Sequence, residues 1–287
     1  MTDKKNILIT GANGQLGNEC KIAAGNFPNY NCTFVTKEAL SIIDKDAIDE
    51  LFSLHHFDFC INCAAYTAVD KAESEKENAF EINATGTANL AAICKKYNAV
   101  LIHISTDYVF NGENADGYVE EDLTGPLNVY GETKLAGEKL AIEINPSAIV
   151  IRTSWVYSSF GKNFVKTMMK LMQEKEQLNV VSDQIGSPTY AADLAEVIFK
   201  IINSSKPVPG IYHYSNKGII SWYDFAQAIR EIGNYPCKVN PIPSSDYPVP
   251  AKRPGFSILK TNKIESTFAI IIPNWKDSLK KCMSLIK

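Results

Sequence analysis

Apolar positions in the first half of the chain follow two alternating spacings. Short, continuous apolar runs of the kind found in buried strands lie at 6–10, 32–36, 57–62, 100–105 and 148–152. Between them, apolar residues recur every three or four positions, which predicts helices at 15–24, 44–54, 78–97 and 129–142. A strand-helix alternation of this kind predicts an α/β fold, in which a doubly wound parallel sheet carries helices on both faces.

The pattern changes after about residue 158. Helices are expected at 164–174, 190–202 and 221–232, with short strands at 178–181 and 210–214. Prolines then crowd the segment 236–254. We therefore expect a smaller C-terminal α+β domain that closes over the sheet and binds the substrate. Its main part is 158–287, the first domain is 1–157, and the chain is expected to return to the first domain near 190–215.

A glycine-rich turn connects the first predicted strand to the first predicted helix. Gly11 permits a tight turn, Gly14 lets the backbone approach a pyrophosphate, and Gly17 lets the helix pack closely on the strand. The helix N-terminus then offers free N–H groups to the phosphates. This combination predicts a Rossmann-type dinucleotide-binding domain, and its expected cofactor contacts are Gly11, Asn13, Gly14, Gln15, Leu16 and Gly17.

The residues after the second predicted strand bear on the choice of cofactor. Lys37 could pair with the 2'-phosphate of NADP, whereas Glu38 could bind the ribose 2'-hydroxyl of NAD. Lys37 slightly favours NADPH as the cofactor, and the use of both NADPH and NADH stays open. Further along, we expect Asp44 to cap the next helix and to lie near the cofactor.

Small residues follow the third predicted strand, where parallel strands end at the ligand crevice. Cys63, Ala64, Ala65 and Tyr66 are therefore expected to contact the cofactor, and Thr67 and Val69 the substrate. Asn83 lies on an apolar helix face. It is either a structural hydrogen-bonding centre or part of the cofactor site.

Candidate acid–base chemistry lies at the start of the helix predicted at 129–142. Tyr130 and Lys134 are four positions apart and therefore share one helix face. A cation beside a phenol lowers the phenol pKa, which makes it a better proton donor and acceptor for a carbonyl/alcohol couple. Thr106, at the end of the fourth strand, could donate a hydrogen bond to a substrate carbonyl. These three residues are the predicted catalytic group.

Composition excludes several classes of function. The 287-residue chain has a formal charge of −3 and no long basic run, so nucleic acid is not an expected partner. No apolar stretch has the length of a membrane span or a signal peptide, and we expect a soluble, cytoplasmic protein. The seven cysteines include a Cys60-x-x-Cys63 pair without a second pair to complete a zinc site, so packing thiols are expected.

Several longer motifs carry a family resemblance. The glycine turn, Thr106 and the Tyr130/Lys134 pair together resemble the extended short-chain dehydrogenase/reductases. Within that group, the segments 62–73, 105–112, 126–131, 152–155 and 251–254 are similar to the dTDP-4-dehydrorhamnose reductases, nearly from end to end. The resemblance implies NAD(P)H-dependent reduction of the C4 ketone of dTDP-4-keto-L-rhamnose, a step toward cell-surface polysaccharide.

Site roles follow from the same resemblance. It implies that Tyr130 protonates the C4 oxygen, that Lys134 holds the nicotinamide ribose and that Thr106 polarises the carbonyl. It places Asp107, Tyr108, Trp155 and Arg253 near the sugar nucleotide. Related dehydratases carry an acid where this chain has Tyr108, so ketone reduction is favoured over elimination.

Two alternatives stay open at this stage. The chain could act as a reductase or epimerase on another nucleotide sugar. It could also be an NADP-binding regulatory subunit of methionine adenosyltransferase, a role that does not need the Tyr/Lys pair. Some relatives bind Mg²⁺ through acids at a dimer contact, so a homodimer and a Mg²⁺ ligand at Glu19 are further expectations of the resemblance.

Overall fold

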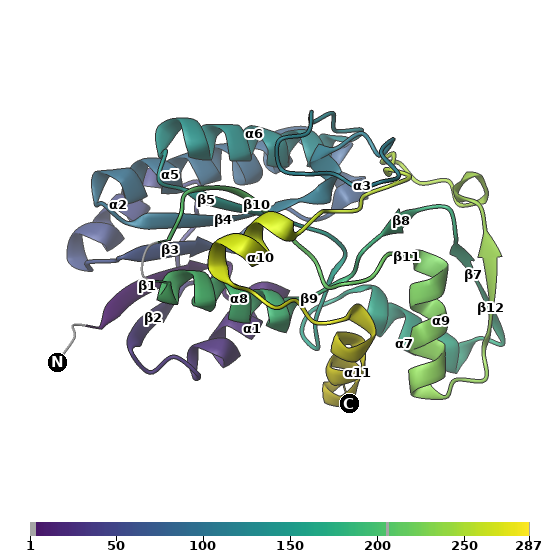
Figure 1. The fold of residues 1–287 in the computed structure, drawn as a ribbon. Coiled ribbons are helices and arrows are strands. Elements are labelled where there is room, and N and C mark those ends of the chain that lie inside the picture. Colours follow the sequence, from purple (N-terminus) through teal and green to yellow (C-terminus); the bar gives the residue numbers. More distant parts are fainter. Residues whose placement is uncertain (1–3, 205–206, 287) are drawn as a thin grey trace.

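The computed structural model describes residues 4–204 and 207–286, and its central feature is a parallel sheet (Figure 1). Six strands lie in the order β10-β5-β4-β3-β1-β2, and all neighbours are parallel. The order reverses between β1 and β3, which is where doubly wound sheets bind ligands. The predicted α/β fold is confirmed. The strands are β1 (Lys5–Thr10), β2 (Tyr30–Phe34), β3 (Phe59–Asn62), β4 (Val100–Thr106), β5 (Ile149–Thr153) and β10 (Gly210–Tyr214).

Helices cover both faces of this sheet (Figure 1). On one face, α1 (Gln15–Ala24) and α8 (Ala191–Asn203) pack against each other and bury the apolar side of β1 and β5. On the other face lie α2 (Lys45–Leu54), α5 (Gly86–Lys96) and α6 (Val129–Ile144). Because strands buried on both sides need apolar residues at every position, their sequences read as continuous apolar runs rather than as an alternation.

A second, smaller unit lies beside the carboxyl ends of the strands (Figure 1). It has its own apolar core around Tyr157, Phe225 and Leu279. The chain leaves this unit to contribute α8 and β10 to the main layer, and then returns to it. Its main elements are α7 (Phe164–Glu174), α9 (Trp222–Gly233), α11 (Trp275–Leu285) and the parallel pair β7 (Gln177–Val181) and β12 (Lys238–Ile242).

The helix expected at 78–97 is interrupted. It consists of α4 (Lys76–Phe80), a π-helical turn at Glu81–Thr85, and α5. Asn83 lies within the turn, and its side chain bonds residues outside the helix. Single π-turns inside α-helices often lie at functional sites. The sequence pattern also missed α10 (Asn262–Phe268), α11 and β12, which are short and follow or lie within the proline-rich segment.

A buried charged network joins the sheet to α6 and to the loop before it. Arg152 on β5 donates to Glu138 on α6 through Nε (3.0 Å to Oε1) and Nη2 (2.8 Å to Oε2). Both side chains are at most 3% exposed. The Ser105 hydroxyl at the end of β4 donates to the same carboxylate. The network therefore fixes the height of α6 above the ends of β4 and β5.

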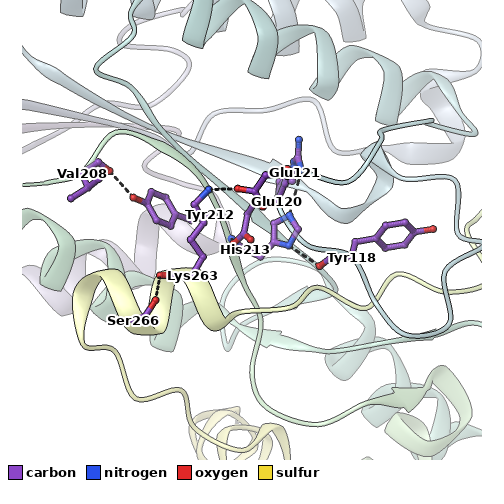
Figure 2. Close-up of polar contacts among 9 residues, drawn as sticks. Tyr118, Glu120, Glu121, Val208, Tyr212, His213, Lys263 and Ser266 are labelled. Carbon is purple, nitrogen blue, oxygen red and sulfur yellow. Dashed lines mark hydrogen bonds and ion pairs between the residues drawn. The ribbon is translucent and has the colours of Figure 1, made fainter.

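The same network continues on β10 (Figure 2). The His213 N–H donates to Glu120 (3.0 Å), and its ring Nδ1 lies 3.2 Å from the Tyr118 carbonyl. Burial and the charge of Arg152 lower the pKa of His213 to about 3, so the ring is neutral. It can therefore donate through Nδ1 and accept from Arg152 through Nε2 (3.4 Å). These contacts hold the loop at 118–121 against the sheet.

Among residues 4–204 and 207–286, no helix combines the length and the apolar character that a bilayer crossing requires.

Candidate active site

The predicted cofactor residues line a cleft of about 460 Å³ at the carboxyl ends of β1 and β3. The main chain of the glycine turn lies very close to the main chain after β3. Gly11 has a φ of +64°, and a Cβ there would lie 2.6 Å from the Ala64 nitrogen. A Cβ on Gly17 would overlap the Gly11 carbonyl. The lining includes the predicted cofactor contacts Gly11, Asn13, Gly14, Lys37, Cys63, Ala64, Ala65 and Tyr66. It also includes Thr67, which was expected to contact the substrate.

The start of α1 fits a dinucleotide phosphate. Gly14 is the N-cap residue, and it has no side chain with which to satisfy the first N–H groups of the helix. Those donors and the positive end of the helix dipole are therefore available to an anion. The donor set and the side-chain-free turn at Gly11 both fit the pyrophosphate of a nicotinamide dinucleotide.

The side chains of two predicted cofactor contacts, Gln15 and Leu16, make structural contacts instead. Gln15 accepts a hydrogen bond from the Asn163 amide (2.9 Å), which connects α1 to α7. The Leu16 side chain is in the core beneath the sheet. Leu16 could therefore bind a phosphate only through its main-chain N–H group.

Of the residues predicted near the adenosine half of the cofactor, Asp44 does not line the cleft. Lys37 and Glu38 both line the cleft and are exposed. Asp44 instead caps α2, where its carboxylate accepts from the Ala47 N–H (3.0 Å). Within the described part of the chain, the cleft lining includes Ser41, Ile42 and Ile43 but not Asp44. The predicted cap at Asp44 is therefore confirmed, whereas its predicted place near the cofactor is not.

Asn83 is a hydrogen-bonding centre between the cleft and the catalytic helix. Its Oδ1 accepts from the Tyr66 N–H (2.9 Å), and its Nδ2 donates to the Tyr66 carbonyl (3.1 Å). The same Nδ2 donates to the Thr133 hydroxyl on α6 (3.0 Å). Of the two predictions made for this residue, the geometry favours the structural one.

Thr106, Tyr130 and Lys134 come together where β4 ends beneath the first turns of α6. The Asn128 side chain caps α6 by accepting from the Gly131 N–H (2.8 Å), and this sets where the helix begins. Thr106 is 5% exposed and Lys134 is 2% exposed. Lys134 Nζ donates to the Ile104 carbonyl (2.6 Å). Tyr130 is half-buried and Lys134 is buried, and the phenol lies close to Thr106.

The electrostatics of this group differ from the expectation. Burial raises the pKa of Tyr130 to about 12, and a hydrogen bond with Thr106 opposes that rise. Burial lowers the pKa of Lys134 to about 8, against the effect of Glu138. In this state Lys134 makes no contribution to the phenol pKa, because its Nζ bonds the Ile104 carbonyl and lies 3.4 Å from the His103 ring.

Asp107 and Tyr108 follow Thr106 in a short 3₁₀ turn. The Tyr108 ring meets the Tyr130 ring edge to face, with centroids 5.9 Å apart. Asp107 is 2% exposed, and burial raises the pKa of its carboxyl to about 7. Both side chains therefore border the catalytic group.

A groove of about 730 Å³ lies in the second unit, and the charge of Arg253 on its lining acts on Tyr108. Arg253 lines it and makes a two-pronged ion pair with Asp70 of α3 (Val69–Ala72), at 3.1 and 2.9 Å. Val69 begins the same short helix. The groove is lined mainly by apolar and amide side chains, among them Phe164, Met168, Leu171, Gln177, Gln184, Trp222 and Tyr247.

Trp155 lies behind this groove. Its ring stacks on Trp222, with centroids 3.7 Å apart, and Trp222 lines the groove. Trp155 also has a φ of +48°, an uncommon conformation for a large residue. Such strain is retained where surrounding contacts fix it. The structure thus gives Trp155 a supporting contact with the groove through Trp222.

The metal expectation at Glu19 is not supported. Glu19 is 3% exposed and accepts a hydrogen bond from Ser158 (2.6 Å), and burial raises its pKa. Across the described residues, no group of three or more His, Cys, Asp or Glu side chains is arranged to hold a metal. In the same part of the chain all seven cysteines are free thiols, and Cys60 is fully buried.

Comparison with known proteins gives a consistent result. Residues 5–287 match the family model described as the RmlD substrate binding domain. The dTDP-4-dehydrorhamnose reductase of Aggregatibacter actinomycetemcomitans is 40% identical, over 96% of this chain and 97% of that protein. The chain belongs to the dTDP-4-dehydrorhamnose reductase family. This places it among enzymes, and the family assignment made from the sequence motifs is confirmed.

Solved structures of the same family share the fold. The dTDP-4-dehydrorhamnose reductase of Bacillus anthracis, solved in complex with NADP, aligns with a TM-score of 0.94 and 39% identity, over 98% of this chain and 99% of that one. A Clostridium acetobutylicum family member aligns with the same TM-score and 42% identity, over 98% of this chain and 99% of that one.

Several residues of this candidate site were not predicted from the sequence. Asp70 was passed over, although its ion pair fixes Arg253. Most of the groove lining comes from α7, β7 and the loop around Tyr247, where the pattern indicated only ordinary amphipathic elements. The one usable signal was Trp222, an aromatic directly after the helix-capping Ser221.

Proposed function

We propose that this chain reduces the C4 ketone of dTDP-4-keto-L-rhamnose to dTDP-L-rhamnose, with NADPH as the preferred hydride donor. The observation that supports the proposal is the set of neighbours around Tyr130. Tyr130 packs on the same apolar cluster as Tyr66, which lines the glycine-turn cleft, and its ring meets Tyr108, which is near Arg253 on the groove. A ketone held there would have the cofactor on one side and the acid on the other. The family of reductases supports the same reaction.

The residues of the chain have separable roles in this proposal. The bound nicotinamide supplies the hydride. Tyr130 gives its proton to the C4 oxygen, and Thr106 orients that oxygen by a hydrogen bond. Lys134, already desolvated, holds the cofactor ribose and favours the phenolate once it forms. The apolar groove takes the nucleotide part of the substrate, and Arg253 at its edge suits the diphosphate.

A panel assay tests the proposal. Purified protein is given NADPH or NADH with dTDP-4-keto-L-rhamnose and with keto sugars carried on other nucleotides, and nicotinamide absorbance is followed. Oxidation dependent on the dTDP sugar, with dTDP-L-rhamnose as the product, is expected. Turnover restricted to another nucleotide sugar, or cofactor binding without turnover on any of them, would contradict the proposal.

Asp70→Asn tests how Arg253 is held. Asp70 pairs with both Nη atoms of Arg253 and accepts from the Ala251 N–H (3.3 Å). Loss of its charge frees the guanidinium to rotate, and we expect KM for the nucleotide sugar to rise about five- to tenfold with little change in kcat. Steady-state kinetics provide the measurement. Asp49→Asn removes a similarly exposed ion pair with Lys96 and should change neither constant; an unchanged KM in Asp70→Asn would disprove the role.

Lys37→Met tests cofactor choice. If Lys37 pairs with the 2'-phosphate, its loss should raise KM for NADPH about tenfold and leave KM for NADH nearly unchanged, because a charge-assisted hydrogen bond disappears. Kinetics with each cofactor under saturating sugar nucleotide measure the ratio. Equal effects on both cofactors would assign Lys37 to general electrostatics instead.

A further inference from the structure

We propose that Asn128 is a positioning residue that couples the loop at 251–253 to the proton donor Tyr130. Its side-chain amide bonds both the first turn of α6 and the main chain of that loop. Because the loop carries Arg253, binding of the substrate diphosphate there fixes the position of the phenol as well. The inference rests on the proposed reduction, and it adds a residue outside the predicted catalytic and cofactor-binding groups.

The Asn128 amide connects two segments that lie 124 positions apart in the sequence. Its Oδ1 accepts from the Gly131 N–H of α6 (2.8 Å), and its Nδ2 donates to the Lys252 carbonyl (2.8 Å). The orientation of the amide is fixed, because only its oxygen can accept and only its nitrogen can donate. Asn128 is 4% exposed, so water competes little for either bond. The start of α6 and the loop are therefore joined by one buried side chain.

The short helix α3 joins the same two segments by a second route. Glu73, directly after α3, accepts from the Val129 N–H at the start of α6 (2.9 Å). Asp70, within α3, pairs with Arg253 in the loop. Asn128 supplies the direct connection and thereby closes a ring of three segments. The position of the loop and the position of the first turn of α6 are consequently linked.

The first turn of α6 lies directly against the catalytic group. A Cβ on Gly131 would overlap the Tyr108 carbonyl, and the Tyr130 ring meets the Tyr108 ring with centroids 5.9 Å apart. A displacement of this turn therefore moves the phenol relative to Tyr108 and Thr106. Misplacement of a reacting group by about 1 Å can lower a rate on the order of a hundredfold. A bond that holds this turn thus acts on kcat as well as on binding.

Two substitutions separate the helix cap from the contact with the loop. Serine caps a helix about as well as asparagine, but it is too short to reach the Lys252 carbonyl, and aspartate keeps the size and the cap without an N–H to donate. In Asn128→Ser and Asn128→Asp we expect kcat to fall about tenfold and KM for the nucleotide sugar to rise about fivefold, with KM for NADPH nearly unchanged. Asp70→Asn should raise KM alone, because Asn128 still holds the main chain of the loop.

Hydrogen exchange with bound dTDP tests the coupling without turnover. In the wild type, dTDP should slow amide exchange about threefold or more both in the loop at 251–253 and in the first turn of α6 at 129–132. In Asn128→Ser, saturating dTDP should still protect the loop but should no longer protect the first turn. A purely structural role would change exchange at 129–132 equally with and without dTDP.

Asn274→Ser is the matched control. Asn274 caps α11 by accepting from the Lys276 N–H (2.9 Å) and is exposed, so kinetics and dTDP protection should equal those of the wild type. Unchanged kcat in both Asn128 variants, or wild-type protection by dTDP of the loop without the first turn of α6, would overturn the coupling. Wild-type protein that is not protected by dTDP at 251–253, or that shows no turnover, would instead reject the proposed function.

Discussion

Tyr130→Phe is expected to lower kcat for the keto sugar nucleotide by about 10²- to 10⁴-fold, the usual contribution of a positioned general acid. The phenylalanine ring can occupy the same site, because the contact with Tyr108 is an edge-to-face packing of rings. Affinity for NADPH should therefore change little. Nicotinamide absorbance measures the rate, and fluorescence titration measures cofactor binding.

Tyr30→Phe serves as the control for this substitution. Tyr30 is the first residue of β2, and its exposed hydroxyl donates to Asn203 at the end of α8 (2.9 Å). Its loss should leave kcat unchanged. Retention of more than about a tenth of the wild-type rate by Tyr130→Phe would remove this phenol from the chemistry.

The second large effect concerns stability. Arg152→Met should lower the free energy of unfolding by about 3–5 kcal/mol, because it leaves the Glu138 carboxylate buried without its cation. Glu138 is 1% exposed, and its remaining donor is the Ser105 hydroxyl. Denaturant unfolding followed by circular dichroism gives the measurement.

A double variant separates the ion pair from simple packing. In Arg152→Met with Glu138→Leu, both charges are replaced by apolar groups, and at least half of the lost stability should return. If the double variant were as unstable as Arg152→Met alone, the lost stability would come from altered packing and not from the unpaired Glu138 carboxylate. Activity of the double variant also reports whether Glu138 matters for Lys134, whose pKa it raises.

Local patterns were sufficient to predict the sheet and the cofactor turn. The apolar runs are continuous because helices cover both faces of each strand. The glycines at 11, 14 and 17 are recognisable from the sequence because a side chain would clash in such a turn. The four-residue spacing of Tyr130 and Lys134 likewise places both residues on one face of a single helix. These features depend on neighbours in the sequence.

Features that depend on distant partners were not predictable. The Asp70–Arg253 pair joins residues 183 positions apart. The raised pKa of Asp107 arises from burial beneath a loop that returns to it from the C-terminal unit. Asp44 caps α2 as predicted but does not line the cofactor cleft. The π-turn at Glu81–Thr85 follows from side-chain contacts of Asn83 that no helical periodicity encodes.

We propose that Thr106, Tyr130 and Lys134 together promote hydride transfer to C4 of a dTDP-linked keto sugar. The most direct measurement uses NADPH deuterated at the transferring position of its nicotinamide and locates the label in the product by NMR. The account predicts one deuterium at C4 of dTDP-L-rhamnose, and almost no labelled product from Tyr130→Phe. Label at another sugar carbon, or undiminished C4 labelling by Tyr130→Phe, would contradict it.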